Sequence, residues 1–173
     1  MTNNNYIPQP GDAVFAHTHN PYGAMIRFAQ AVRWWKYRSW NHMAIVESVD
    51  ANGQVWVIQM ARRCERVRIE DVAPGGHVKV IPCPKTVNCE EAVAYAQRQL
   101  GTKYGVLTIV SIAINIMLPA FFRFDIHIAD TLICSALVAR SWEHGSWDCP
   151  TDPFDITPAE FDGVLGGGGV QIY

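Results

Sequence analysis

The sequence predicts an α+β domain in which a small antiparallel sheet packs against helices. Strand-like runs fill the first half of the chain and helical patterns dominate the second, an order typical of α+β proteins. With 173 residues, 49% of them hydrophobic, the chain is long enough to bury one core. We therefore expect one domain at 11–165, with a flexible tail at 1–10 and a glycine-rich flexible tail at 166–173.

The predicted sheet consists of short apolar runs separated by turn residues. A first run at 13–16 follows a Pro-Gly-Asp turn. The clearest pair of strands is 42–49 and 54–60, because the Asp-Ala-Asn-Gly segment between them is typical of a hairpin. Two further strands are expected at 65–69 and 77–81, before Pro82 and Pro84 end the sheet.

Helices are predicted where apolar residues recur at helical spacing and capping residues mark the ends. The first, at about 22–37, is amphipathic with a basic face. The next two span 89–100 and 133–144, and each is followed by a glycine. A last short helix is expected after Thr157, because Thr-Pro-Ala-Glu reads as a capping box with proline at the first helical position.

Charge and cysteine content exclude several classes of function. A net charge of -2 and a pI near 6.3 provide no general attraction to nucleic acid. The five cysteines lack zinc-site spacing and are interpreted as reduced thiols, and His17 and His19 as ordinary loop histidines. No metal or other cofactor is expected. The first residues lack the features of a secretory signal, so cytoplasmic synthesis is expected, with the final location left open.

Two segments raise the question of membrane contact. An uncharged run of 19 residues, Tyr104 to Phe122, is about as long as a membrane-spanning helix. Asn115 and Pro119 within it favour a buried, interrupted helix. The basic and aromatic segment 33–40 is expected to pack its aromatic rings on the sheet, with contact to a membrane surface as the alternative.

Three residues are candidates for a catalytic site. Cys134 lies at a predicted helix start, where backbone N–H groups lower the pKa of a thiol and bind an oxyanion; core packing is the alternative. His42 opens an apolar strand, where an imidazole is costly unless it is a core-edge histidine bonded to backbone. With a four-residue loop at 50–53, Gln59 lies opposite Ala44 and on the face of His42, whereas Glu47 points away. Gln59 is therefore placed to orient the imidazole.

Six short motifs occur in one order along the chain: Gly11-Asp12, 42–46, 57–60, 101–104, 133–138 and 156–158. Their order resembles that of the circularly permuted papain-like branch of the NlpC/P60 cysteine hydrolases, the YiiX/YebB-like proteins, over about residues 10–162. The resemblance implies a permuted papain-like fold in which Cys134 is the nucleophile, His42 is the base and the Tyr104 hydroxyl helps to bind the oxyanion. Gln59 stands where the family carries an acidic or other polar orienting residue, and a neutral amide holds a tautomer without stabilising an imidazolium by charge.

The resemblance implies a thiol hydrolase that cleaves an amide, or less readily a thioester or ester, through an acyl-enzyme on Cys134. Family substrates range from cell-wall peptides to lipid-linked acyl groups, and we expect a peptidoglycan-type peptide or an acyl amide with an apolar group. The alternatives are a non-catalytic module that binds cell-wall or lipid groups, which Gln59 favours, and a small membrane protein. A helix at 105–122 would rise about 27 Å, so crossing a bilayer would separate Tyr104 from Cys134. The hydrolase hypothesis requires both ends of the apolar run to meet at one site.

Overall fold

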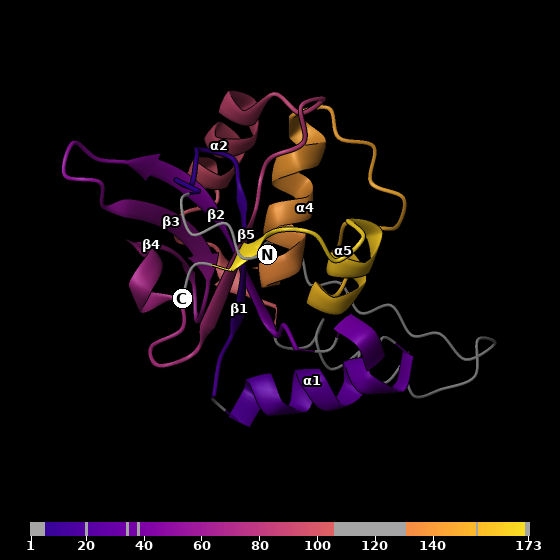
Figure 1. Cartoon of the computed structure of the whole chain (residues 1–173). Helices are drawn as coiled ribbons and strands as arrows, with labels where there is room; N and C mark the ends of the chain where they lie inside the picture. Colours follow the sequence, from indigo (N-terminus) through magenta and orange to yellow (C-terminus); the bar gives the residue numbers. More distant parts are fainter. Residues whose placement is uncertain are drawn as a thin grey trace.

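The computed structural model describes residues 6–19, 21–33, 35–37, 39–105, 131–154 and 156–171. Within these ranges the predicted α+β architecture is confirmed: a sheet of order β4-β3-β2-β1-β5-β8 has antiparallel neighbours throughout and is covered by helices (Figure 1). The strands are β1 Ala13–His17, β2 His42–Val49, β3 Val55–Met60, β4 Cys64–Arg68, β5 His77–Ile81 and β8 Val170–Gln171. The helices are α1 Pro21–Arg33, α2 Cys89–Arg98, α4 Cys134–His144 and α5 Pro158–Val164, with 3-10 turns η1 Trp35–Tyr37 and η2 Ile69–Asp71.

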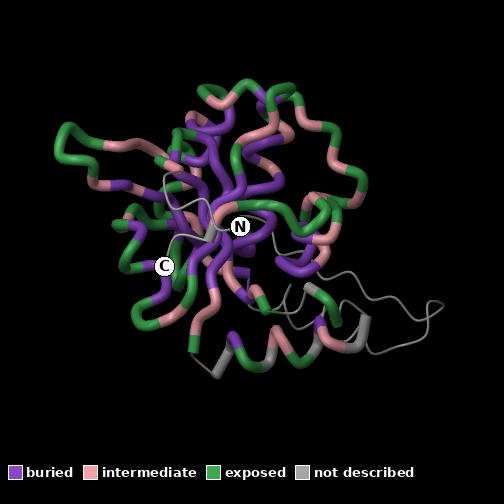
Figure 2. The backbone as a smooth tube through the Cα atoms, in the orientation of Figure 1, coloured by how far each residue is buried: buried purple, intermediate pink, exposed green. Residues whose placement is uncertain are grey.

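The two faces of the sheet bury different sets of side chains, as the period of two along each strand requires. One face, with Phe15, Met43 and Ile58, packs against α2 and α4. The other face, with Val14, Val46 and their neighbours, is covered by apolar residues of the segment 69–73. Figure 2 shows the buried backbone concentrated in the sheet and along α4, whereas the tip of the β2–β3 hairpin is exposed.

The β2–β3 hairpin sets the positions of two candidate site residues. Ala44 pairs with Gln59, as the predicted register requires. The predicted loop 50–53 is too short, because Val49 pairs with Val55 and leaves 50–54 in the loop. A β-bulge between Val46 and Ser48 adds a residue to β2 and cancels this shift before Ala44 is reached.

The two chain segments that flank residues 106–130 lie side by side. A short parallel pair joins β6, Lys103–Tyr104, to β7, Thr131–Leu132, and the amide of Gly105 donates to the carbonyl of Leu132 at 2.9 Å. The predicted helix at 105–122 lies outside the described residues from 106 onward. In the described part of the chain, no helix has the length and hydrophobicity to span a membrane.

Residues of both predicted tails make contacts in the structure. Val170 pairs with Val80, which fills the outer edge of β5 and satisfies backbone groups that an open strand edge leaves unpaired. Gly169 allows this approach, because its φ is +118° and an added Cβ would lie 2.9 Å from the Val80 carbonyl oxygen. At the other end, the Tyr6 hydroxyl donates to Asp12 at 2.7 Å, which orders the segment before Gly11.

The predicted basic helix at 22–37 is divided into α1 and the separate turn η1. The expectation that its aromatic rings pack on the sheet holds for Trp40, which packs against the core. It is wrong for Trp35, which is 68% exposed, and Phe28 on α1 is 70% exposed. Trp34 lies outside the described residues.

Two buried polar side chains attach α1 and α5 to the chain that enters β2. Gln30 on α1 donates from Nε2 to the carbonyl of Trp40 at 3.0 Å and accepts from the amide of Ala159 at 2.8 Å. Lys79 on β5 forms a buried ion pair with Asp162 on α5, and its Nζ lies 5.0 Å from the ring centroid of Trp40. Both contacts converge on Trp40, so the start of β2 is held from two sides.

The position of α4 on the sheet depends on contacts near its C-terminal end. The indole of the fully buried Trp142 donates to the carbonyl of Gly11 at 2.8 Å. Gly145 closes α4, and its carbonyl accepts from the amide of Asn88, the N-cap of α2, at 2.8 Å. A Cβ at Gly145 would lie 2.6 Å from the Asn88 carbonyl oxygen, so only glycine permits this approach.

We predict that Gly145→Ala lowers the free energy of unfolding by about 1–3 kcal/mol, because backbone must move to admit the methyl group. Denaturant unfolding followed by circular dichroism measures the change. Gly168→Ala is the matched control: its nearest contact is 3.7 Å away, and we expect a change below about 0.5 kcal/mol. Equal unfolding midpoints for the two variants would contradict the proposed packing constraint.

Candidate active site

Cys134 is the first residue of α4 and directly follows β7 and the N-cap Ile133. Ile133 is extended at φ -102° and ψ 163°, and its carbonyl accepts the first helical hydrogen bond, from Leu137, at 3.0 Å. The side chain of Cys134 is 2% exposed. The thiol therefore lies at the N-terminal end of a buried helix, where backbone N–H groups lack partners within the helix.

His42, the first residue of β2, faces this thiol. Burial opposes the charged imidazolium, but a hydrogen bond and the charge of Cys134 raise the pKa of His42, and the Gln59 hydrogen bond and the Glu65 charge add to this effect. These effects together outweigh burial, so the pKa of His42 is above the ordinary value for histidine. His42 is therefore in place to hold a proton taken from the thiol.

The pKa of Cys134 is lowered, although burial by itself raises it. Burial is outweighed by the hydrogen bond and charge of His42 together with hydrogen bonds from the backbone amides of Met43 and Ser135, all of which favour the thiolate. The other shifts resolved for cysteines go the opposite way, because burial raises the pKa of Cys64 to about 12 and also raises that of Cys83 and Cys149. The environment of Cys134 thus favours the nucleophilic form.

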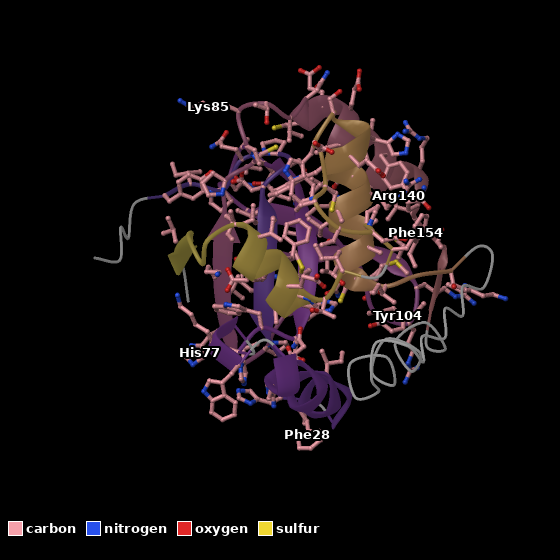
Figure 3. All side chains as sticks on the ribbon, turned by 90° about the vertical axis from the view of Figure 1, so that its right-hand side faces the viewer. Phe28, His77, Lys85, Tyr104, Arg140 and Phe154 are labelled. Carbon is pink, nitrogen blue, oxygen red and sulfur yellow. The ribbon has the colours of Figure 1, made fainter. Side chains whose placement is uncertain are left out.

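Tyr104 reaches the same thiol from β6. Its pairing with Leu132 places it beside the chain that leads into α4, and it lies near the N-terminal end of this helix (Figure 3). Burial, followed by the charge and hydrogen bond of Cys134, raises the pKa of Tyr104, so the hydroxyl keeps its proton. A protonated hydroxyl is a donor, as the oxyanion role implied by the resemblance requires.

Gln59 contacts His42, as its register predicted. Gln59 Oε1 lies 2.8 Å from His42 Nε2, and the amide is buried with 6% exposure. Since this contact uses Nε2, the other ring nitrogen, Nδ1, is left for the thiol. The structure therefore brings together all four residues that the sequence singled out: Cys134, His42, Gln59 and Tyr104.

Sequence reasoning missed Glu65, which contacts Gln59. On β4, Glu65 pairs directly with Gln59 on β3, and Gln59 Nε2 donates to its carboxylate at 3.1 Å. The sequence contained the information needed to find this contact, because both strands were predicted. A hairpin with residues 61–63 as its loop places Glu65 opposite Gln59.

The remaining polar candidates do not join the site. His17 and His19 lie in ring contact, with centroids 5.0 Å apart, and His17 Nδ1 bonds to the Ser39 carbonyl. The Ser135 hydroxyl is buried without a recorded hydrogen-bond partner in the described part of the chain. Asp125 and Asp130, which lie near Cys134 in the sequence, are outside the described residues.

We predict that iodoacetamide at pH 7 alkylates Cys134 about tenfold or more faster than Cys64, Cys83 or Cys149, because only the Cys134 pKa among these is lowered. His42→Ala should suppress this difference. Mass spectrometry of tryptic peptides measures each rate, and the unfolded protein, in which the thiols become equivalent, is the control. Equal labelling of the cysteines in the folded protein would contradict the assignment.

Comparison with known proteins adds information on the fold. No protein-family model matches the chain, and no curated protein sequence matches it. Among solved structures, the chain is similar to the crystal structure of the metalloprotein YiiX from Escherichia coli O157:H7 (DUF1105), with a TM-score of 0.57 and 16% identity over 81% of this chain and 67% of that one. In the ranges described here, no group of three or more His, Cys, Asp or Glu side chains is arranged to hold a metal ion. The similarity shows that this chain has the YiiX-like fold.

Proposed function

We propose that this protein is a cysteine hydrolase of permuted papain-like fold, with Cys134 as nucleophile and His42 as base. The main support for this proposal is the buried thiol at the start of α4, whose pKa is lowered by His42 and by two backbone amides. A cysteine that only packs in the core needs no groups that stabilise a thiolate, and burial alone keeps its thiol protonated. The similarity to YiiX supports the fold part of the proposal.

The chemistry follows from the positions of the donors. His42 Nδ1 takes the thiol proton, and the thiolate Sγ attacks the carbonyl carbon of the substrate. The oxyanion accepts hydrogen bonds from the free N–H groups at the start of α4 and from the Tyr104 hydroxyl. The intermediate collapses when the imidazolium gives its proton to the leaving amine. Water, deprotonated by His42, then hydrolyses the thioester and restores the thiol.

The substrate class we favour is an amide of a peptidoglycan-type peptide, with lipid-linked acyl amides and esters next. The net charge of -2 and the lack of a basic domain disfavour nucleic acid as a partner. A non-catalytic module of the same fold is the competing function. The lowered pKa of Cys134 favours the hydrolase, because a binding module has no need of a thiolate.

We predict that the protein hydrolyses at least one member of a panel of muropeptide amides, acyl amides and acyl esters, and that Cys134→Ser abolishes the turnover. Tyr104→Phe should lower kcat about 10- to 1,000-fold, because one oxyanion donor is lost, while KM changes little. Chromatographic detection of both products measures the rates.

Cys149→Ser is the control for the general effect of losing a thiol, and it should keep the wild-type rate. Turnover that survives Cys134→Ser would contradict the proposed nucleophile. Binding of panel members without any turnover would support the non-catalytic module.

Contact with an anionic membrane surface is the second part of the proposal. Phe28 on α1 and Trp35 on η1 are strongly exposed, and Lys36 beside Trp35 is exposed as well. No acidic residue occurs between Asp12 and Glu47, so this part of the chain is positively charged. Exposed aromatic rings near basic residues suit the headgroup region of an anionic bilayer.

We predict that the protein co-sediments with phosphatidylglycerol vesicles more than with phosphatidylcholine vesicles, and that the double variant Phe28→Ala, Trp35→Ala weakens this binding about tenfold. Ile7→Ala is the matched control, since Ile7 is 65% exposed but lies outside α1 and η1. High salt should also weaken binding, because it screens the attraction to anionic lipid. Equal binding of both variants would contradict the assigned surface.

A further inference from the structure

The amide of Gln59 bridges two groups whose chemistry determines its orientation. Its Nε2 lies 3.1 Å from Glu65 Oε1, and its Oε1 lies 2.8 Å from His42 Nε2. An ionised carboxylate only accepts hydrogen bonds, so the NH₂ end of the amide must face Glu65. The oxygen end then faces His42, and since an amide oxygen only accepts, the proton on the imidazole must be at Nε2. The lone pair of the neutral ring is left on Nδ1, toward Cys134.

The bridge also separates a partly buried hydrogen bond from an exposed charge. Gln59 is buried and Glu65 is exposed. A carboxylate in the buried position of Gln59, directly against the partly buried imidazole, would lose most of its hydration, which is expensive unless the charge is fully paired. With the amide between them, Glu65 keeps its water and still acts on His42 through the hydrogen-bond chain and by its charge.

Among the described residues, the charged and titratable groups that act on His42 come from two elements. Cys134 on α4 faces the ring directly, and Glu65 on β4 acts from beyond Gln59. Tyr104 on β6 acts on Cys134. Glu65 therefore stabilises the imidazolium from the side opposite the thiolate, where Gln59 has no charge to contribute.

We propose that Glu65 is a positioning residue of the active site, which orients the Gln59 amide and thereby fixes the His42 tautomer while its charge stabilises the imidazolium. The proposal rests on the proposed hydrolase function for its catalytic meaning. Gln59 is neutral, so it can orient the imidazole of His42 but cannot stabilise the imidazolium by charge. Gln59 and Glu65 together perform both tasks, as a single acidic residue would.

Glu65→Gln tests the charge alone, because the new amide oxygen still accepts from Gln59 Nε2. We expect the His42 imidazolium, followed by NMR of the ring protons, to lose its proton at a pH lower by up to about one unit, a change of up to tenfold in the ionisation equilibrium. The alkaline limb of the activity profile should move in the same direction, because it reports the loss of this proton. Glu65→Asp keeps the charge, so the His42 imidazolium should lose its proton at a pH between those of the wild type and Glu65→Gln.

Glu70→Gln is the matched control. Glu70 also accepts a hydrogen bond from a glutamine, Gln54 Nε2 at 2.8 Å, but it lies beside the hairpin loop and away from the site. We expect His42 to titrate as in the wild type. Glu65→Ala removes the acceptor as well as the charge, so the Gln59 amide can turn; kcat should fall about a further tenfold relative to Glu65→Gln, with KM little changed.

Circular dichroism establishes that each variant is folded. His42 titration that is the same in the wild type, Glu65→Gln and Glu65→Ala would overturn the role of Glu65, even if the enzyme is active. The NMR titration needs no substrate, so it can support the role of Glu65 even if the panel yields no turnover, an outcome that counts only against the hydrolase function.

Discussion

The contact between Cys134 and His42 is the interaction on which the rest of the site depends. Cys134 is buried and His42 is partly buried, and burial by itself disfavours a thiolate and an imidazolium alike. Each becomes favourable only beside the other, so a small separation of α4 from the start of β2 would leave an ordinary buried thiol. The fold therefore has to hold one helix terminus against one strand terminus.

Several contacts outside the site provide this constraint. Trp142 and Gly145 attach the C-terminal half of α4 to the sheet and to the start of α2. Gln30 holds the chain that enters β2, through the Trp40 carbonyl. The β6–β7 pair brings Tyr104 beside the strand that leads into Cys134. These contacts join segments that are distant in the sequence, and none of them takes part in the proposed chemistry.

The electrostatic arrangement is graded from the buried interior to the surface. The thiol is almost completely buried, the Gln59 amide is buried and satisfied at both ends, and the Glu65 carboxylate is exposed. A neutral group in the middle avoids the desolvation of a second buried charge. The chain of hydrogen bonds thus combines the orienting effect of a carboxylate with the packing of an amide.

Local sequence patterns were sufficient to predict most of the strands and helices, and the contact between His42 and Gln59. The turn residues at 50–53 predicted the hairpin, and the period of two along the strands placed Gln59 on the face of His42. The loop is one residue longer than predicted, but the bulge at Glu47 adds one residue to β2, so the predicted pairing of Ala44 with Gln59 is kept. Three contacts could be found only in the folded chain: α4 meets β2, Glu65 accepts a hydrogen bond from Gln59, and Val170 extends the sheet. Turn chemistry and periodicity act between near neighbours in the chain, whereas these contacts depend on how whole elements pack, and packing is a property of the complete core.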